Sequence, residues 1–447
     1  MWKNLPKCND CGNTSREPQL TCPKCKGLIS IPPISGPSIN DLNLSSMWSL
    51  NAFLPNFSKP ISLVEGNTPL LPITNIENYQ NLSLKLEFRN PTGSFRDRAC
   101  SLIISDAVEK NVNNIIGAST GSFSISLAAY AAKARINSVN VVPQNLELSK
   151  IEQIKVYGGI VVEKGESVDE AINHSLEMQK NSDSYYASPE NNLLTIEGQK
   201  TIGLELALQK DRLDCILVPR GSGSLIYSIY RGFEDAISSG WIEEYPKIYA
   251  ISLEKTQVAH LAESLEVQEA FLLDKVKKII QETEGKEIEI DAESMLDEAL
   301  ELAKNEGLFI EPSSASVLVA AKSLIKEKEI TAESTVAILS GSGMNTLNVY
   351  AARLRGKKKI VWGLSESSTT KFEILNLIAD KKADYGYFIW ISLGKNQSLQ
   401  SIYQHLTELE EKGLIVPSEK EVKRKHYELT KKGLETLVNM RNLIDYL

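Results

Sequence analysis

Short apolar runs alternate with longer amphipathic stretches between about residues 47 and 355. The short runs have the length of buried strands, and the longer stretches repeat apolar residues at the three- and four-residue spacing of a helix. The strand-like runs lie at 115–116, 139–142, 159–162, 215–218, 248–251 and 336–339, and the helical stretches include 124–134, 168–179, 196–208 and 295–305. This alternation predicts an α/β domain with mostly parallel sheets.

A different pattern begins after the lysines at 357–359. Helical spacing over 369–379, from 385 onward and over 397–412 is followed by an apolar run at 414–416 and a turn at Pro417-Ser418. A second strand-like run at 422–429 and a helix at 431–446 complete the chain. Three helices, two strands around a basic tip and a final helix predict a winged helix-turn-helix.

Composition excludes several classes of protein. Of 447 residues, 42 % are hydrophobic and 24 % are charged, so a large core can form and an intrinsically disordered chain is excluded. No run of eighteen apolar residues and no apolar N-terminal signal core occur, so we expect a cytoplasmic protein. A Pro-, Ser- and Gly-rich stretch at 31–46 is expected to be a linker. Together with the change of hydrophobic pattern after the lysines at 357–359, it predicts domains at 1–30, 47–355 and 366–447.

Charge is unevenly distributed along the chain. The net charge is −8, whereas residues 357–447 carry 15 Lys and Arg against 12 Asp and Glu. A mildly basic tail on an acidic body suggests a separate partner for the tail, although an imbalance this small is also within ordinary variation.

Four of the six cysteines lie within the first twenty-five residues, as two C-x-x-C pairs: Cys8, Cys11, Cys22 and Cys25. Each pair can present two thiolates from one tight turn, and two such turns complete a tetrahedral sulfur shell. The doubled motif favours structural zinc over the alternatives, which are two disulfides or a redox pair. Cys100 and Cys215 stand alone in apolar surroundings and are expected in the core.

Two glycine-containing segments carry most of the chemical information. The first reads Asn-Pro-Thr-Gly-Ser-Phe-Arg-Asp-Arg at 90–98, and the second reads Ala-Ser-Thr-Gly-Ser at 118–122. A glycine turn between a strand and a helix directs backbone N–H groups and the helix N-terminus at an anion. On its own this signal is weak, because many α/β turns look alike.

In combination, these segments resemble threonine synthase, a pyridoxal-phosphate (PLP) enzyme of the tryptophan-synthase-β-like family. Further matching stretches lie in family order at 65–70, 127–130, 197–201, 218–223 and 306–315. The resemblance implies a two-lobed α/β domain of PLP fold type II. An N-terminal zinc ribbon also occurs in some members of that family.

The resemblance implies how PLP would be held. Gly221, Ser222, Gly223 and Ser224 would cradle its phosphate through backbone amides and a helix dipole. Ser340 would face the pyridine nitrogen, and Ser122 takes the place of a family asparagine that contacts the ring hydroxyl.

The sequence departs from the family at Arg96. At this position the other family members have a lysine, which forms the Schiff base with PLP. A guanidinium stays charged and is a poor nucleophile, so we expect no catalytic residue there and no threonine synthesis by the usual route. Lys85, Lys150 and Lys200 are other amines, but each has a different place in the family scaffold. Either the protein has decayed to an inactive relative, or Arg96 pairs with a carboxylate or phosphate in a repurposed pocket.

The C-terminal residues resemble the PadR-type winged-helix regulators, through Tyr-Gly-Tyr at 385–387 and stretches at 401–406, 409–415 and 427–433. The third helix would present Ser398, Ser401, Gln404 and His405 to a major groove. The wing would bring Lys420, Lys423, Arg424 and Lys425 to phosphates. Three glutamates, Glu408, Glu410 and Glu411, must then point away from DNA. The alternative is a winged helix used for protein contacts or dimerisation.

The sequence therefore supports two hypotheses. In the first, a catalytically inactive threonine-synthase-like domain senses PLP or a small anionic amino-acid-type ligand, and the winged helix binds double-stranded DNA as a homodimer. PLP, if bound, would be held non-covalently. In the second, the chain is an active threonine synthase or related amino-acid lyase with a regulatory C-terminal domain.

Overall fold

The computed structural model describes residues 2–144, 146–165, 167–254, 265, 270–354, 366–380, 383–393, 398–418 and 425–445. The chain divides into two compact units, Met1–Ala351 and Ala352–Leu447, and each is described by itself. Among the described helices, none combines the length and the apolar character needed to cross a bilayer.

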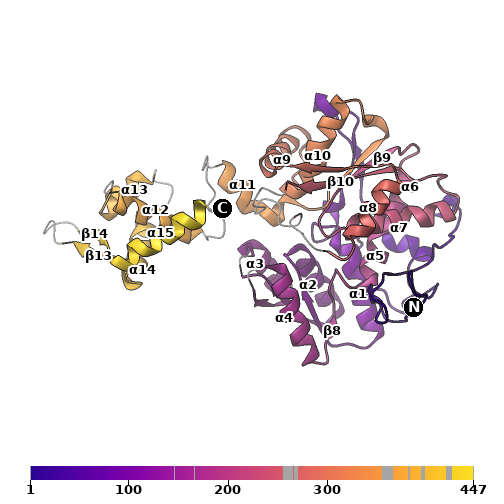
Figure 1. Cartoon of the computed structure of the whole chain (residues 1–447), viewed down its shortest axis with the longest axis horizontal. Coiled ribbons are helices and arrows are strands. Elements are labelled where there is room, and N and C mark those ends of the chain that lie inside the picture. The colour runs from indigo at the N-terminus through magenta and orange to yellow at the C-terminus, as the bar shows by residue number, and fades with distance from the viewer. Residues whose placement is uncertain are drawn as a thin grey trace. The chain divides into compact units, whose positions relative to one another are not determined.

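The first unit contains two sheets, one in each of its lobes (Figure 1). The six-stranded sheet has the order β11-β10-β9-β12-β4-β3 and is parallel except for β3. Its strands are β3 (Leu70–Pro72), β4 (Ser83–Lys85), β9 (Cys215–Pro219), β10 (Lys247–Leu253), β11 (Glu287–Ile290) and β12 (Thr335–Ile338). The four-stranded sheet is parallel throughout, in the order β7-β6-β5-β8. Its strands are β5 (Asn114–Ala118), β6 (Asn137–Val142), β7 (Ile160–Glu163) and β8 (Tyr185–Tyr186).

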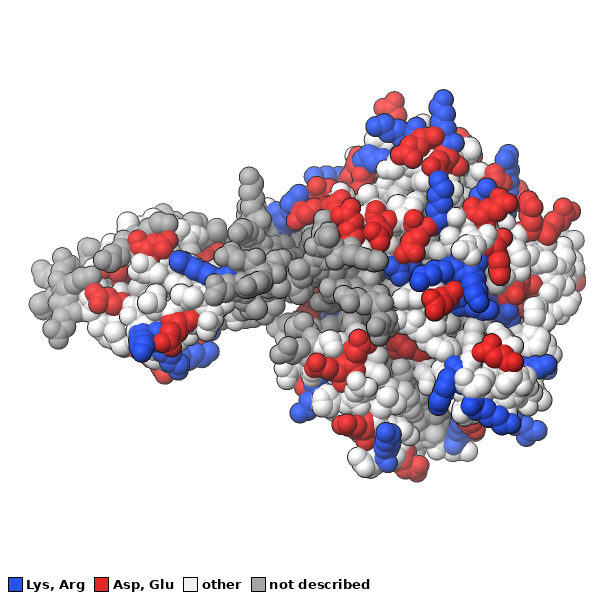
Figure 2. All heavy atoms as spheres, in the orientation of Figure 1, with Lys and Arg blue, Asp and Glu red and all other residues white. Residues whose placement is uncertain are grey.

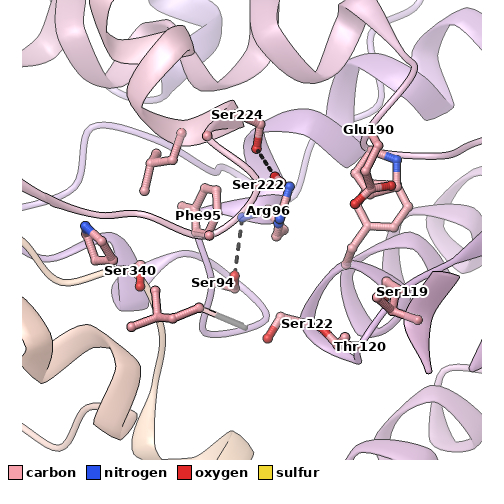
Figure 3. A pocket seen from close by; sticks show the side chains of 18 of the residues that line it. Ser94, Phe95, Arg96, Ser119, Thr120, Ser122, Glu190, Ser222, Ser224 and Ser340 are labelled. Atoms are coloured by element: carbon pink, nitrogen blue, oxygen red, sulfur yellow. Dashed lines mark hydrogen bonds between the residues drawn. The ribbon is translucent and has the colours of Figure 1, made fainter. Parts of the chain in front are cut away.

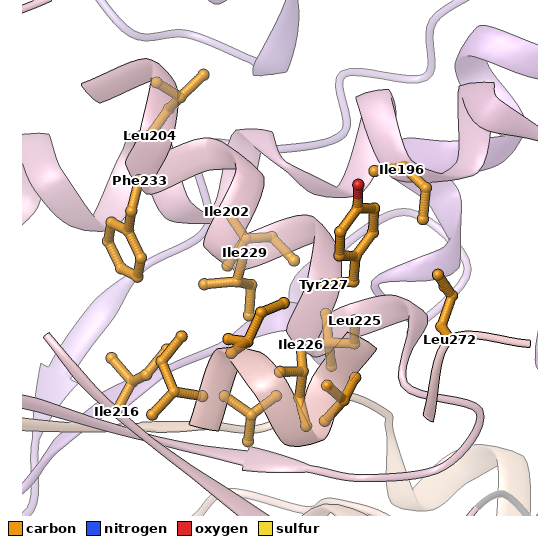
Figure 4. Close-up of a cluster of buried hydrophobic side chains, with 14 of the residues drawn as sticks. Ile196, Ile202, Leu204, Ile216, Leu225, Ile226, Tyr227, Ile229, Phe233 and Leu272 are labelled. Carbon is orange, nitrogen blue, oxygen red and sulfur yellow. The ribbon is translucent and has the colours of Figure 1, made fainter. Parts of the chain in front are cut away.

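Helices cover the sheets, and each lobe has its own apolar core. The helices are α1 (Arg96–Glu109), α2 (Ser122–Ala134), α3 (Leu148–Val156), α4 (Val168–Lys180), α5 (Leu193–Gln199), α6 (Thr201–Gln209), α7 (Ser224–Ser238), α8 (Leu273–Glu282), α9 (Ala292–Glu306), α10 (Pro312–Lys326) and α11 (Leu347–Leu354). In the larger core, Ile202 and Ile229 of α6 and α7 pack with Ile216 of β9 (Figure 4). In the smaller lobe, Ile103 of α1 packs with Leu127 of α2. The mixed α/β class and the parallel sheets expected from the sequence are confirmed.

One expected helix is two. The helical stretch at 196–208 is divided between α5 and α6, which meet at Lys200. The Thr201 hydroxyl donates to the carbonyl of Gly198 over 2.6 Å. Gly198 has no room for a side chain, because a Cβ would lie 2.2 Å from the Arg98 carbonyl oxygen. The close packing of α5 on α1 thus interrupts a helical pattern that periodicity alone predicts as continuous.

The cysteine-bearing N-terminus belongs to the first unit. A short antiparallel pair, β1 (Lys7–Cys8) and β2 (Ile29–Ser30), holds it together, and Leu20 and Ile29 join the larger core. The stretch at 31–46 is also fixed to this unit. The Ile34 N–H donates to Asp235 Oδ1 over 2.8 Å, and the Gly36 N–H donates to Ser239 Oγ over 2.9 Å. The expected linker is therefore held against α7.

The second unit has the expected order of a winged helix. It contains α12 (Glu366–Ala379), α13 (Gly386–Ser392), α14 (Leu399–Glu411), β13 (Ile415–Ser418), β14 (His426–Leu429) and α15 (Lys431–Asp445). Its core includes Ile374, Ile389, Leu406 and Tyr427.

The turn expected at Pro417-Ser418 is wrong, because both residues lie in β13, opposite Tyr427 and His426. Proline is tolerated at the open edge of a two-stranded ribbon, where its missing N–H costs no ladder bond.

Candidate functional site

One pocket of the first unit brings together every residue that the resemblance assigns to PLP. Elements far apart in sequence supply its walls: the N-terminus of α1, the turn before α2, the loop after β8, the β9–α7 loop and the end of β12. The assigned residues that line it are Arg96, Ser122, Gly221, Ser222, Gly223, Ser224 and Ser340 (Figure 3). A pocket beyond the carboxyl ends of parallel strands is where α/β proteins bind ligands.

The turn between β5 and α2 is built by a serine and a glycine. The Ser119 hydroxyl accepts from the Gly121 N–H over 3.0 Å and from the Ser124 N–H over 3.1 Å, so it caps the first turn of α2. Gly121 has φ +126°, and a Cβ there would lie 2.4 Å from the side chain of Lys150. The absence of a side chain at Gly121 therefore leaves room for the Lys150 side chain, while Ser119, Thr120 and Ser122 of the same turn line the pocket.

The loop between β9 and α7 fits a phosphate. Gly223 precedes α7 with φ +85°, a conformation that favours glycine, and a Cβ would approach Val276 Cγ2 to 2.8 Å. Ser222 and Ser224 place hydroxyls beside the N-terminus of this fifteen-residue helix. Backbone amides, a positive helix end and hydroxyls are the donor set that an anion prefers.

Arg96 is the first residue of α1. Its guanidinium carbon lies 4.7 Å from the centroid of the Phe95 ring, and its Nη1 is buried without a hydrogen-bond partner. Burial lowers the pKa of Arg96, while the negative charges of Glu190 and Glu311 oppose this shift. The side chain remains a cation, because arginine does not deprotonate in proteins.

Glu190 also lines the pocket, and the sequence interpretation did not include it. It lies in the loop after β8, where the Ser188 hydroxyl donates to its Oε2 over 2.9 Å. Burial raises the pKa of Glu190, and the charge of Arg96 opposes this shift. Its sequence surroundings, Ser-Pro-Glu-Asn-Asn, have no periodic pattern that would have indicated a site.

Asp97 holds the loop that precedes α1. Its carboxylate accepts from the Thr92 N–H over 2.7 Å, from the Thr92 hydroxyl over 2.5 Å and from the Ser126 hydroxyl over 2.5 Å. Burial raises the pKa of Asp97 to about 6, although these hydrogen bonds lower it in part. The backbone that carries Arg96 is therefore fixed to α2.

The other lysines do not replace the missing amine. Lys85 is fully buried in an ion pair with Glu205, and Lys200 forms ion pairs with Glu197 and Asp235. Lys150 packs over Gly121 and lies near Glu147, with Nζ 3.9 Å from Oε2. The phosphate end of the pocket thus fits PLP, whereas the position of covalent attachment holds a guanidinium.

The four N-terminal cysteines converge as their spacing predicts. The sulfurs of Cys8, Cys11, Cys22 and Cys25 all lie within 4.8 Å of one another. None of the described cysteines forms a disulfide. The Cys8 and Cys25 sulfurs lie 3.4 Å apart and those of Cys11 and Cys22 lie 3.7 Å apart, and the cluster fits a zinc ribbon with four thiolate ligands.

In the second unit, α14 is the helix that the sequence assigns to the major groove. Ser398 caps it, accepting from the Ser401 N–H over 3.1 Å, and Gln404 is exposed. His405, however, is buried with Leu406 in the core, and burial lowers its pKa. The structure corrects the expectation for His405, because its side chain faces inward rather than toward a groove.

The acidic residues of α14 are partly neutralised. Glu408 forms an ion pair with Lys371 of α12, and Glu410 forms one with Lys425, whose Nζ lies 2.7 Å from Oε2. Glu411 is exposed. Of the expected wing residues, Lys425 is described and half-exposed, whereas Lys420, Lys423 and Arg424 lie outside the described residues. On the face shown in Figure 2, basic and acidic side chains of the first unit are intermixed.

Comparison with known families agrees with this division. Residues 61–341 match the family described as pyridoxal-phosphate dependent enzyme, and residues 374–439 match the transcriptional regulator PadR-like family. The chain belongs to the pyridoxal-phosphate dependent enzyme family and carries a C-terminal PadR-like winged-helix domain.

Its relatives include threonine synthases. The chain is 29 % identical over 377 residues to the threonine synthase of Methanocaldococcus jannaschii, covering 76 % of this chain and 92 % of the relative. It is 30 % identical over 310 residues to the threonine synthase of Bacillus sp. (strain ULM1), covering 64 % of this chain and 84 % of the relative. The threonine-synthase-like character inferred from the motifs is confirmed.

Solved structures confirm the fold. An O-acetylserine dependent cystathionine beta-synthase from Helicobacter pylori superposes with a TM-score of 0.54 at 22 % identity, covering 69 % of this chain and 98 % of its own. A threonine deaminase isoform 2 from Solanum lycopersicum gives 0.53 at 20 % identity, with coverages of 65 % and 88 %. These likenesses show the two-lobed fold of PLP fold type II.

Proposed function

We propose that this protein is a ligand-responsive, DNA-binding regulator whose PLP-type domain is catalytically inactive. The observation that carries the proposal is Arg96, which stands in the pocket where the resemblance implies a lysine. A permanently charged guanidinium cannot form an imine with a carbonyl group or transfer protons near neutral pH. The rest of the pocket is retained, so its remaining use is binding. PLP held non-covalently, or a small amino-acid-type ligand carrying a carboxylate, is the expected occupant.

The PadR-like domain supplies the output of this regulator. Gln404 and Ser401 on α14 would read a major groove, and Lys425 together with the basic residues 420, 423 and 424 would meet phosphates. On α15, Leu434 and Val438 are exposed one helical turn apart, which favours a homodimer that reads a palindrome.

We further propose that Cys8, Cys11, Cys22 and Cys25 hold a structural zinc ion. Four protein ligands leave no open coordination position, so this metal would stabilise the N-terminal segment without catalysing a reaction. Reduced thiols are the form that ligates zinc, and they persist in the cytoplasm, where we expect the protein to act.

A selection experiment tests the regulator. The full chain is incubated with a random-sequence duplex library at low salt, with and without PLP and the common amino acids, and bound duplexes are sequenced. We expect a palindromic sequence to be enriched, with affinity that changes when a ligand is present. Failure to retain any duplex at low salt under all of these conditions would contradict the proposal.

The second candidate function is an active PLP-dependent threonine synthase or related amino-acid lyase with a regulatory C-terminal domain. The phosphate-binding loop and the threonine synthase relatives favour it. Formation of threonine from its phosphorylated precursor by the unmodified chain, supplied with PLP, would support this function over the first.

A further inference from the structure

The charges that line the pocket do not match a simple anion. Among the described lining residues, Arg96 is the one cation, whereas Glu190 and Glu311 are acidic. A phosphate or carboxylate ion bound at Arg96 would therefore face two carboxyl groups, and like charges at close range in a partly buried site are costly. An occupant that satisfies Arg96 must also be compatible with these acids.

Arg96 and Glu190 influence each other without forming a direct ion pair. The charge of each shifts the pKa of the other, yet the described ion pairs join neither residue to the other within 4.0 Å. In Figure 3 both side chains are drawn at the pocket, the guanidinium on α1 and the carboxylate on the loop after β8. The two opposite charges therefore border the same pocket without pairing directly with each other.

Each of the two charges has unused bonding capacity. Arg96 Nη1 is buried with no hydrogen-bond partner, which costs free energy until a ligand acceptor fills the position. Glu190 accepts the Ser188 hydroxyl at Oε2, and a carboxylate can accept several hydrogen bonds, so it can also accept from a ligand donor. The guanidinium of Arg96 can therefore donate hydrogen bonds to one end of a small molecule, and the carboxylate of Glu190 can accept them from the other end.

We propose that Arg96 and Glu190 together form a recognition site for the zwitterion of an α-amino acid, with Arg96 binding the α-carboxylate and Glu190 binding the α-ammonium group. This inference rests on the proposed function, since it names the ligand class of the same pocket. The zwitterion adds no net charge, and it pairs the guanidinium of Arg96 and the carboxylate of Glu190 each with an opposite charge. Hydroxyl groups of Ser94, Thr120 and Ser122, which also line the pocket, would contact the amino-acid side chain.

Calorimetric titration of the full chain tests the site with defined probes. Each of the common L-α-amino acids is titrated first, and the tightest binder is then compared with its decarboxylated amine and its deaminated acid. We expect both analogues to bind at least about tenfold more weakly, because each loses one charge-assisted hydrogen-bonded contact. This comparison uses the unmodified chain, so it does not depend on the folding of any variant.

Two substitutions assign the contacts. Glu190→Gln should weaken amino-acid binding about tenfold while leaving the affinity for the deaminated acid unchanged, and Arg96→Gln should spare only the amine. A merely structural role would weaken all three ligands together. The exposed residues Glu177 and Arg212 provide matched controls, Glu177→Gln and Arg212→Gln, which should bind as the unmodified chain does. Circular dichroism confirms that each variant is folded.

Three results would overturn the inference: no amino acid binds, the deaminated acid binds as tightly as its amino acid, or Glu190→Gln changes nothing. The outcome is separable from that of the proposed function. Amino-acid binding without any effect on DNA binding would contradict the proposed regulator function and support the amino-acid site. DNA binding without amino-acid binding would contradict the amino-acid site and leave the DNA-binding function supported.

Discussion

Lys85 and Glu205 form an ion pair with no solvent exposure, the Lys85 Nζ lying 2.6 Å from the Glu205 Oε2. Arg98 of α1 lies on the other side, with Nη1 2.6 Å from Glu205 Oε1, and it also pairs with the buried Glu87. Two cations and two anions thus balance one another in the interior. Because Arg98 belongs to α1 and Glu205 to α6, the network joins elements of the two lobes of the first unit.

Removal of the Glu205 charge should be strongly destabilising. In a Glu205→Gln variant, Arg98 and Lys85 keep their charges but lose the partner that they share, so we expect the free energy of unfolding to fall by about 3–5 kcal/mol. Chemical denaturation followed by circular dichroism measures the change. Glu177→Gln, at an exposed position of α4, serves as the control and should change stability by less than about 0.5 kcal/mol.

The same network predicts a pH dependence. Burial by itself raises the pKa of Glu205, but the charges and hydrogen bonds of Arg98 and Lys85 outweigh this effect and lower it to about 2. The stability contributed by this carboxylate is therefore fully present above its ordinary value near 4.5, and it is lost as the pH falls from there toward 2. The stability difference between the unmodified chain and Glu205→Gln should shrink over this range. A difference that stayed constant would contradict the assignment.

Restoring the amine should restore covalent attachment. We expect an Arg96→Lys chain incubated with PLP and then reduced with borohydride to gain the mass of one phosphopyridoxyl group, because lysine can form the imine that arginine cannot. Intact-mass spectrometry makes the measurement. The unmodified chain and Arg96→Gln should gain no mass at this position. A reduced adduct mapped by peptide analysis to Lys150 in the unmodified chain would count against an inactive site.

Metal removal should destabilise the N-terminal part of the first unit. Elemental analysis should find one zinc ion per chain, and Cys11→Ser or Cys25→Ser should lower this content, since each removes an exposed sulfur of the cluster. The melting temperature should fall by several degrees in these variants and after chelation, because Leu20 and Cys22 pack in the larger core. Cys215→Ser changes a buried cysteine outside the cluster and should retain the zinc.

Substitution on α14 should weaken sequence-specific DNA binding. Gln404→Ala removes an exposed amide suited to base edges, and we expect a loss of about 1–3 kcal/mol on the selected duplex with little change on random DNA. Fluorescence anisotropy at several salt concentrations separates the two effects. Gln179→Ala, on α4 of the first unit, is the control. An equal loss on both duplexes would assign Gln404 to a non-specific role.

The parts of the site that the sequence predicts are those with local signatures. The cysteine spacing and the two glycine turns are short-range patterns, and the side chains they carry converge as expected. Glu190 has no such signature. It lies 94 positions after Arg96 in the sequence, and the loop after the two-residue strand β8 brings it to the same pocket. Only the three-dimensional packing of the four-stranded sheet reveals that Arg96 and Glu190 line one pocket.

The inward placement of His405 was within reach of the sequence. Ile402, His405 and Leu409 follow helical spacing, so the histidine shares a face with apolar residues whose burial the spacing predicts. Its polar ring suggested a base contact, whereas the phase of the helix indicated burial. The prediction of a turn at Pro417 is wrong for another reason. Proline interrupts most strands, but it is accepted at an open edge such as that of β13.

The segment between the two cysteine pairs is hydrogen-bonded to the chain that directly follows Glu190 of the pocket. The Leu193 N–H donates to the Pro18 carbonyl over 2.8 Å, and the Leu20 N–H donates to the Asn191 carbonyl over 3.3 Å. Glu190 directly precedes this paired stretch. A chain shortened by its first thirty residues would therefore leave the loop of Glu190 without the backbone that pairs with it. Ligand affinity measured on such a fragment would report a loosened loop instead of the protein's own selectivity.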